Sequence, residues 1–142
     1  MWVYYSGGPV TIGGQVEQWN EVRMQTGLAT IRRDGFVSLD VEEGSRAGSF
    51  VTIPFQHAGE DLSLELNASG LNSEGGGHIQ VELLLDDKVV ATSGAVTTSG
   101  VRIPVDWPQG RHLPLRPGRL RLRFRLNNNA ELYSFTFQKA DR

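Results

Sequence analysis

The feature that most constrains the fold of this chain is an alternation of apolar and polar residues with a period of two. It is clearest near the C-terminus, where Leu120, Leu122, Phe124 and Leu126 alternate with Arg119, Arg121, Arg123 and Arg125. The same period recurs in residues 62–66, 79–85 and 132–137. Such a period puts one strand face against a core and the other toward solvent, as antiparallel sheets require. The chain is therefore predicted to be all-β.

Turn-forming residues divide the sequence into nine or ten short strands. Asp34-Gly35 predicts a hairpin between residues 28–33 and 36–41. Asp86-Asp87 predicts a second turn, after residues 79–85. In the last apolar segment, the period puts Tyr133, Phe135 and Phe137 on one face and Leu132 on the other. Loops or turns are also expected in residues 70–77 and 127–129, while the prolines confine residues 104–118 to an edge strand and an extended loop.

Many short strands with frequent turns are typical of a sandwich or a barrel. We expect a two-sheet antiparallel β-sandwich of jelly-roll type, with a closed barrel as the alternative. The length of 142 residues suits one domain over residues 1–142. Residues 15–24 are the best helical candidate, although their period is ambiguous.

Composition excludes several classes of function. The net charge of −2 gives no strong field for nucleic acid or an anionic membrane, so neither is expected as a partner. The chain has no cysteine, which excludes disulfides and thiolate chemistry. It also has no run of about 18 apolar residues, so no membrane-spanning helix is expected.

Two segments carry a resemblance to a known family. They are TGLATIRRDGFVSL at residues 26–39, and LRLRFRL at residues 120–126 followed by AELYSF at 130–135. Together they resemble the C-terminal β-sandwich that follows a five-bladed propeller in fructosidase-like (furanosidase-superfamily) bacterial proteins. The resemblance covers residues 1–137, and within it residues 1–8 are similar to a final propeller strand.

The resemblance implies an accessory role. In such proteins the glycosidase carboxylates belong to the propeller, so no catalytic residue carries over to this chain. The sandwich packs on the propeller, in some cases builds a dimer, and in some cases contributes to sugar binding. It further implies a glycoside hydrolase as the parent protein and an extracellular or periplasmic location.

The four arginines of residues 119–125 form the most unusual candidate site. Alternation places them on one strand face, about 6.6 Å apart, so acidic partners should lie opposite. Glu65 and Glu82 are the expected cross-strand partners. Arg121 and Arg123 are then candidate ligands for carboxylated or sulfated polysaccharide, because guanidinium groups bind such anions bidentately. The alternative is a solvated face that keeps the sheet soluble.

Aromatic residues supply the other binding candidates. Trp19, in a polar-rich segment, and Trp107, beside Arg111 in the proline-rich loop, are candidate platforms for sugar rings. Core packing is the alternative for each tryptophan. The rings of residues 2–5 would be uncovered without a propeller, which predicts self-association.

Catalytic and metal sites are not indicated by the sequence. The adjacent acidic residues are typical of solvated turns rather than of a glycosidase pair with a defined separation. The three histidines lack zinc-site spacing. No cofactor is expected, and a structural calcium is disfavoured although four acidic residues could contribute ligands: Asp40, Glu42, Glu43 and Asp61.

These observations predict a non-catalytic carbohydrate-binding module, associated with a glycoside hydrolase, that binds polysaccharide or oligosaccharide. Two alternatives remain open. One is a structural module that supports a propeller or builds a homo-oligomer, and the other is a small glycan-active enzyme.

Overall fold

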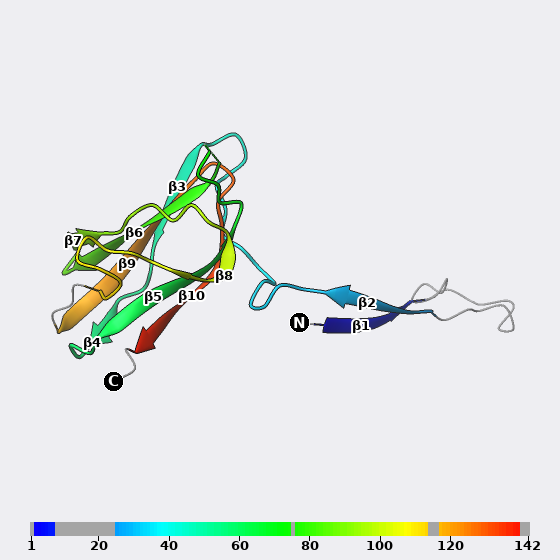
Figure 1. Cartoon of the computed structure of the whole chain (residues 1–142), viewed down its shortest axis with the longest axis horizontal. Helices are drawn as coiled ribbons and strands as arrows, with labels where there is room; N and C mark the ends of the chain where they lie inside the picture. Colours follow the sequence, from blue (N-terminus) through cyan, green and yellow to red (C-terminus); the bar gives the residue numbers. More distant parts are fainter. Residues whose placement is uncertain (1, 8–24, 75, 114–116, 140–142) are drawn as a thin grey trace, which may run out of the picture. The chain divides into compact units, whose positions relative to one another are not determined.

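The computed structural model of this chain describes residues 2–7, 25–74, 76–113 and 117–139 (Figure 1). Those residues contain ten β-strands and no helix, which confirms the all-β prediction. They fall into two compact units, residues 1–36 and residues 37–142. The predicted single domain over residues 1–142 stays a prediction. Trp19 and the candidate helix at residues 15–24 lie outside the described residues.

The first unit contains one antiparallel hairpin, formed by β1 (Trp2–Gly7) and β2 (Gln25–Thr30). Trp2 faces Thr30 and Tyr4 faces Leu28 across the pair. The Tyr5 ring lies against Gly27 on the other face of the hairpin. An isolated two-stranded hairpin is at best marginally stable in water, because it has almost no interior.

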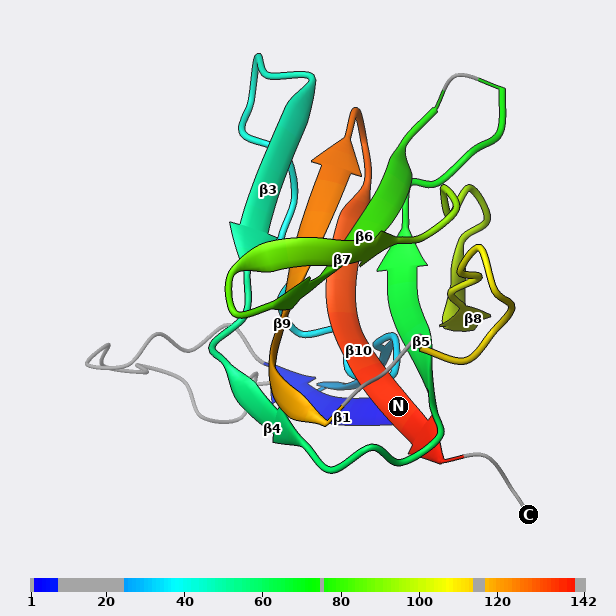
Figure 2. The same cartoon turned by 90° about the vertical axis from the view of Figure 1, so that its left-hand side faces the viewer.

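The second unit is a sandwich of two antiparallel sheets (Figure 2). In the larger sheet β9 is central, with β6 on one side and both β3 and β4 on the other, while β7 pairs with β6. The five strands are β3 (Ala47–Val51), β4 (Phe55–His57), β6 (His78–Leu85), β7 (Lys88–Thr92) and β9 (Gly118–Asn127). The smaller sheet has the order β10 (Glu131–Lys139), β5 (Leu62–Ser69), β8 (Gly100–Pro104).

The core lies between the two sheets and is built by the residues of predicted inward parity. Leu120, Leu122 and Phe124 of β9 are at most 2% exposed, as are Leu64 and Leu66 of β5. Phe124 stacks on Phe50 of β3 at 5.0 Å between ring centroids. It also contacts Phe135 of β10 in the opposite sheet at 5.1 Å, so this one ring ties both sheets together. The two-sheet sandwich is thus confirmed, while the jelly-roll topology stays a prediction.

In β10 the predicted parity is wrong at its start. A register shift between Leu132 and Ser134 inserts Tyr133 as an extra residue opposite β5. Leu132 therefore faces the core together with Phe135 and Phe137. The Tyr133 hydroxyl instead donates a hydrogen bond to Glu131 Oε2 at 2.6 Å.

The two predicted aspartate turns behave differently. Asp86 and Asp87 have φ of 49° and 63°, the pair of positive values that a two-residue type I′ hairpin needs, and they join β6 to β7 as predicted. At the other site the turn is centred on Arg33 and Asp34, and only Asp34 has positive φ. The predicted hairpin there is wrong, because in the described chain β2 pairs with β1.

Candidate functional site

The arginine row lies on the outer face of the five-stranded sheet. Along β9 buried apolar residues alternate with Arg119, Arg121, Arg123 and Arg125, all of them at least partly exposed. This confirms the predicted placement of four guanidinium groups on one face of one strand. Because β9 is the central strand, its outer side chains are flanked on both sides by those of its neighbours.

The strand register groups the outer side chains into rows that run across the sheet. Arg125 pairs with Ser49 on β3 and with Gln80 on β6. One step along β9, Arg123 pairs with Val51 and with Glu82. Beyond those rows, Arg121 lies opposite Leu84 and Arg119 opposite Gln56 of β4. The neighbours of Arg125 are therefore polar, whereas Arg123 and Arg121 each have one apolar neighbour, Val51 and Leu84 respectively.

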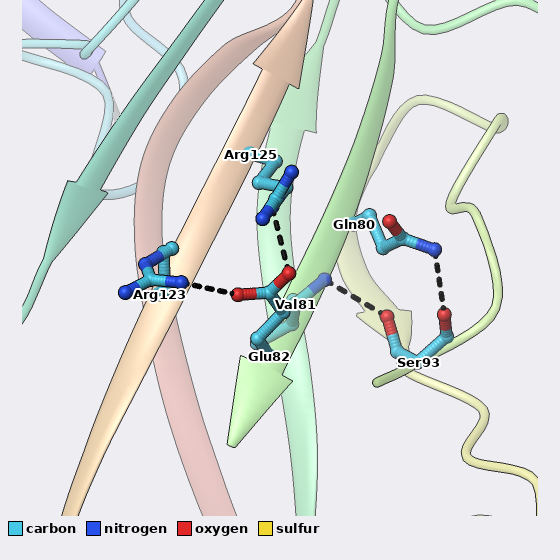
Figure 3. Close-up of polar contacts among 6 residues, drawn as sticks. All are labelled: Gln80, Val81, Glu82, Ser93, Arg123 and Arg125. Atoms are coloured by element: carbon cyan, nitrogen blue, oxygen red, sulfur yellow. Dashed lines mark hydrogen bonds and ion pairs between the residues drawn. The ribbon is translucent and has the colours of Figure 1, made fainter. Parts of the chain in front are cut away.

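Glu82 holds two of the arginines in place (Figure 3). Its Oε2 accepts a hydrogen bond from Arg123 Nη1 at 2.8 Å, and its Oε1 lies 2.7 Å from Arg125 Nε. The Glu82 side chain is only 9% exposed, so little water solvates its charge. The negative charge of a carboxylate so shielded is compensated chiefly by the two guanidinium groups. Glu82 is thus one of the two cross-strand partners expected from the sequence.

The other expected partner, Glu65, lies on β5 in the opposite sheet and faces Pro104 and Thr136. Arg121 instead pairs with Asp87 in the β6–β7 turn, with 3.0 Å between Nη1 and Oδ1. Arg119 has no acidic partner among the described residues. Four arginines are thus matched by two carboxylates, and the row keeps an excess of two positive charges.

A groove of about 470 Å³ opens at the Arg125 end of the row. It crosses three strands and is lined by Ala47, Gly48, Ser49, His78, Gln80, Arg125, Leu126 and Asn127. None of these residues is acidic. Gln80 is oriented by donating a hydrogen bond from Nε2 to the Ser93 carbonyl at 3.1 Å, which leaves its own carbonyl oxygen as an acceptor (Figure 3).

The residues predicted from the proline-rich loop lie apart from the arginine row. Trp107 is 4% exposed and belongs to the core, which is the core-packing alternative, so its ring presents no face at the surface. Its Nε1 has no hydrogen-bond partner in the part of the chain that the structure describes. Arg111 is well exposed, and its Nε lies 3.5 Å from Asp106 Oδ1. Trp107 thus anchors this loop from inside.

A second pocket, of about 540 Å³, lies beside β8, the edge strand of the smaller sheet. Residues 94–100 form most of its wall, with Arg102 and Asp106 as its charged members. One cation and one anion give it no excess charge. The described residues contain no group of three or more His, Cys, Asp or Glu side chains that could hold a metal ion.

Ser49, His78 and Gln80 were missed by the sequence analysis as candidate site residues. Their relation to Arg125 depends on the register of three strands that lie far apart in the chain. The alternation in residues 79–85 indicated that Gln80 and Glu82 face solvent. It did not indicate which strand lies beside them.

Comparisons of this chain with protein-family models, with curated proteins and with solved structures find no match. Among the described residues there is also no helix long and apolar enough to cross a membrane.

Proposed function

We propose that this chain is a non-catalytic carbohydrate-binding module whose binding surface is the outer face of the five-stranded sheet. The observation that carries the proposal is the arginine row of β9, with four guanidinium groups against two carboxylates and a polar groove at its end. The row and groove provide hydrogen-bond donors along an extended surface, which suits a chain of sugar units with hydroxyl or acidic groups.

The chemistry of the face favours recognition by polar contacts rather than by stacking. The described side chains flanking the row, such as Ser49, Gln80 and Leu84, include no phenylalanine, tyrosine or tryptophan. Affinity must then come from hydrogen bonds and charge, and it will fall as salt screens the arginines. The sequence resemblance to sandwiches that follow a glycosidase propeller supports an extracellular or periplasmic accessory role.

The proposal is tested by affinity electrophoresis of the purified chain in gels containing neutral or acidic polysaccharides, followed by titration calorimetry. At least one polysaccharide class should retard the chain. Arg121→Gln or Arg123→Gln should weaken binding by about tenfold, because each removes a charged hydrogen-bond donor. Arg102→Gln, the same charge change on β8 of the other sheet, is the matched control and should bind like the parent chain.

Two results would count against this assignment. Absence of retardation by every polysaccharide would contradict carbohydrate binding. Loss of binding in Arg111→Gln, with Arg121→Gln and Arg123→Gln unaffected, would move the site to the proline-rich loop.

A structural or oligomer-building role is the second candidate, and the hairpin of β1 and β2 favours it. Its twelve residues carry no charge, and Trp2 and Tyr4 are 66% and 71% exposed. Exposed aromatic surface of this kind tends to associate. Under this candidate, sedimentation velocity should show an oligomer that grows with concentration and disappears in Trp2→Ser/Tyr4→Ser. A monomer at every concentration would contradict it.

A further inference from the structure

The groove at the Arg125 end of the arginine row has the composition of an anion site. Arg125 is the only formally charged residue among the eight that line it. Ser49 and Gln80 flank Arg125 in one cross-strand row, and Ala47 and His78 flank Asn127 in the next. A ligand group in the groove would therefore meet one cation and several neutral hydrogen-bonding groups, and no carboxylate among the lining residues.

The contact between Glu82 and Arg125 determines which edge of the guanidinium is open. Glu82 Oε1 lies 2.7 Å from Nε, so the side-on edge of Arg125 is occupied. No second acidic residue pairs with Arg125 in the described chain, and its side chain is 51% exposed. A carboxylate or sulfate oxygen pair fits the end-on edge of the guanidinium with two parallel hydrogen bonds. Glu82 also anchors the neighbouring Arg123 through its other oxygen.

We propose that this groove is the specificity subsite of the domain and that it binds an acidic substituent, a carboxylate or a sulfate ester, on a polysaccharide. This inference rests on the proposed function. Arg125 is the binding residue, through its Nη groups. Ser49 and the Gln80 carbonyl oxygen contact hydroxyl groups of the same sugar unit. Glu82 is a positioning residue, because it fixes the direction of the Arg125 guanidinium without facing the ligand.

The test compares one polymer with and without its acidic groups. Binding of dextran and dextran sulfate to the full chain is measured by titration calorimetry, with polygalacturonate as the carboxylated arm. Dextran sulfate, polygalacturonate or both should bind at least about tenfold more tightly than dextran, since a charged pair of hydrogen bonds distinguishes them. Which acidic polymer binds identifies the substituent as a sulfate or a carboxylate.

Two variants assign the preference to the groove. Arg125→Gln should lose the preference for acidic polymer by about tenfold or more, while Arg102→Gln keeps it. Ser49→Phe adds bulk to the groove without changing the charge, at an exposed position on an edge strand that tolerates an aromatic residue. Ser49→Phe should weaken the binding of acidic polymer to a similar extent. Thr136→Phe, at an exposed position on β10, an edge strand of the smaller sheet, is its control.

The outcomes separate this inference from the function on which it rests. Equal binding of dextran and both acidic polymers would overturn the subsite and leave carbohydrate binding intact. Tight acidic binding that survives both Arg125→Gln and Ser49→Phe would also overturn it, because the anion would then be bound elsewhere. Failure to bind any polysaccharide would instead contradict the proposed function itself.

Discussion

At the scale of single residues, the outer face is organised by one shielded carboxylate. The Glu82 side chain is 9% exposed, whereas the side chains of Arg123 and Arg125, which it contacts, are 30% and 51% exposed. The carboxylate thus depends on the arginines for its charge compensation, while each arginine keeps contact with water. Without Glu82, two guanidinium groups of like charge would sit side by side, with only solvent between them.

Glu82→Gln should lower the free energy of unfolding by about 1–2 kcal/mol, because the amide nitrogen accepts no hydrogen bond from an arginine. Urea unfolding at low salt measures the change. Glu65→Gln is the matched control: it makes the same substitution on β5 of the other sheet, where Glu65 has no ion-pair partner in the described chain. An equal effect of the two substitutions would contradict this role of Glu82.

Lys139, at the end of β10, acts on Glu60. The hydrogen bond from Lys139 Nζ, at 2.9 Å, and the lysine's charge hold the pKa of the Glu60 carboxyl below its ordinary value of 4.5. A depressed pKa contributes stability that is present above the unfolded-state value and is lost as the pH falls through the folded one. Lys139→Gln should therefore raise the pKa of Glu60 toward 4.5, as measured by NMR titration of its side-chain carboxyl. An unchanged pKa would show that the pair does not form in solution.

At the scale of secondary-structure elements, the alternation of apolar and polar residues predicted which side chains are buried wherever a strand is long and regular. The predicted parity of β9 matches its burial residue by residue, because a slip by one would expose Leu122 and Phe124 and bury the arginines. The Asp86-Asp87 turn could also be predicted from the local sequence, because its geometry depends on two adjacent residues that tolerate positive φ. In β10 the bulge at Tyr133 broke the period, and nothing in the local sequence marks it.

The loop between β5 and β6 contains a close backbone approach that only glycine allows. Gly70 has φ of 69°, and a Cβ at this position would overlap the carbonyl of Asn129 in the β9–β10 turn. Gly70→Ala should therefore lower the free energy of unfolding by at least about 2 kcal/mol.

The matched control for that substitution is Gly44→Ala. Gly44 has a similar φ of 84°, but a methyl group added at its Cα would meet no other atom within 4 Å. Only the backbone cost of about 1 kcal/mol therefore applies to this variant. Thermal or urea unfolding of both variants measures the difference. Equal destabilisation would show that the close approach at Gly70 contributes nothing.

At the scale of the whole molecule, the candidate site is a product of long-range pairing. Ser49, Gln80 and Arg125 meet only because β3 and β6 flank β9 in one particular register. A single sequence indicates which residues of a strand face outward, but it does not indicate which strands are neighbours. For the same reason Trp107 was a candidate platform until the packing of its loop placed the ring in the core.

Whether a polysaccharide binds the outer face of the five-stranded sheet can be seen by mapping the residues that contact it. Backbone amide NMR spectra of the isotope-labelled chain are recorded during titration with short dextran sulfate or polygalacturonate fragments. Binding at the outer face should give shifts concentrated in β3, β6 and β9, around Ser49, Gln80 and residues 121–126. Shifts confined to β5, β8 and β10, or to residues 105–113, would contradict it, as would spectra unchanged at saturating polysaccharide.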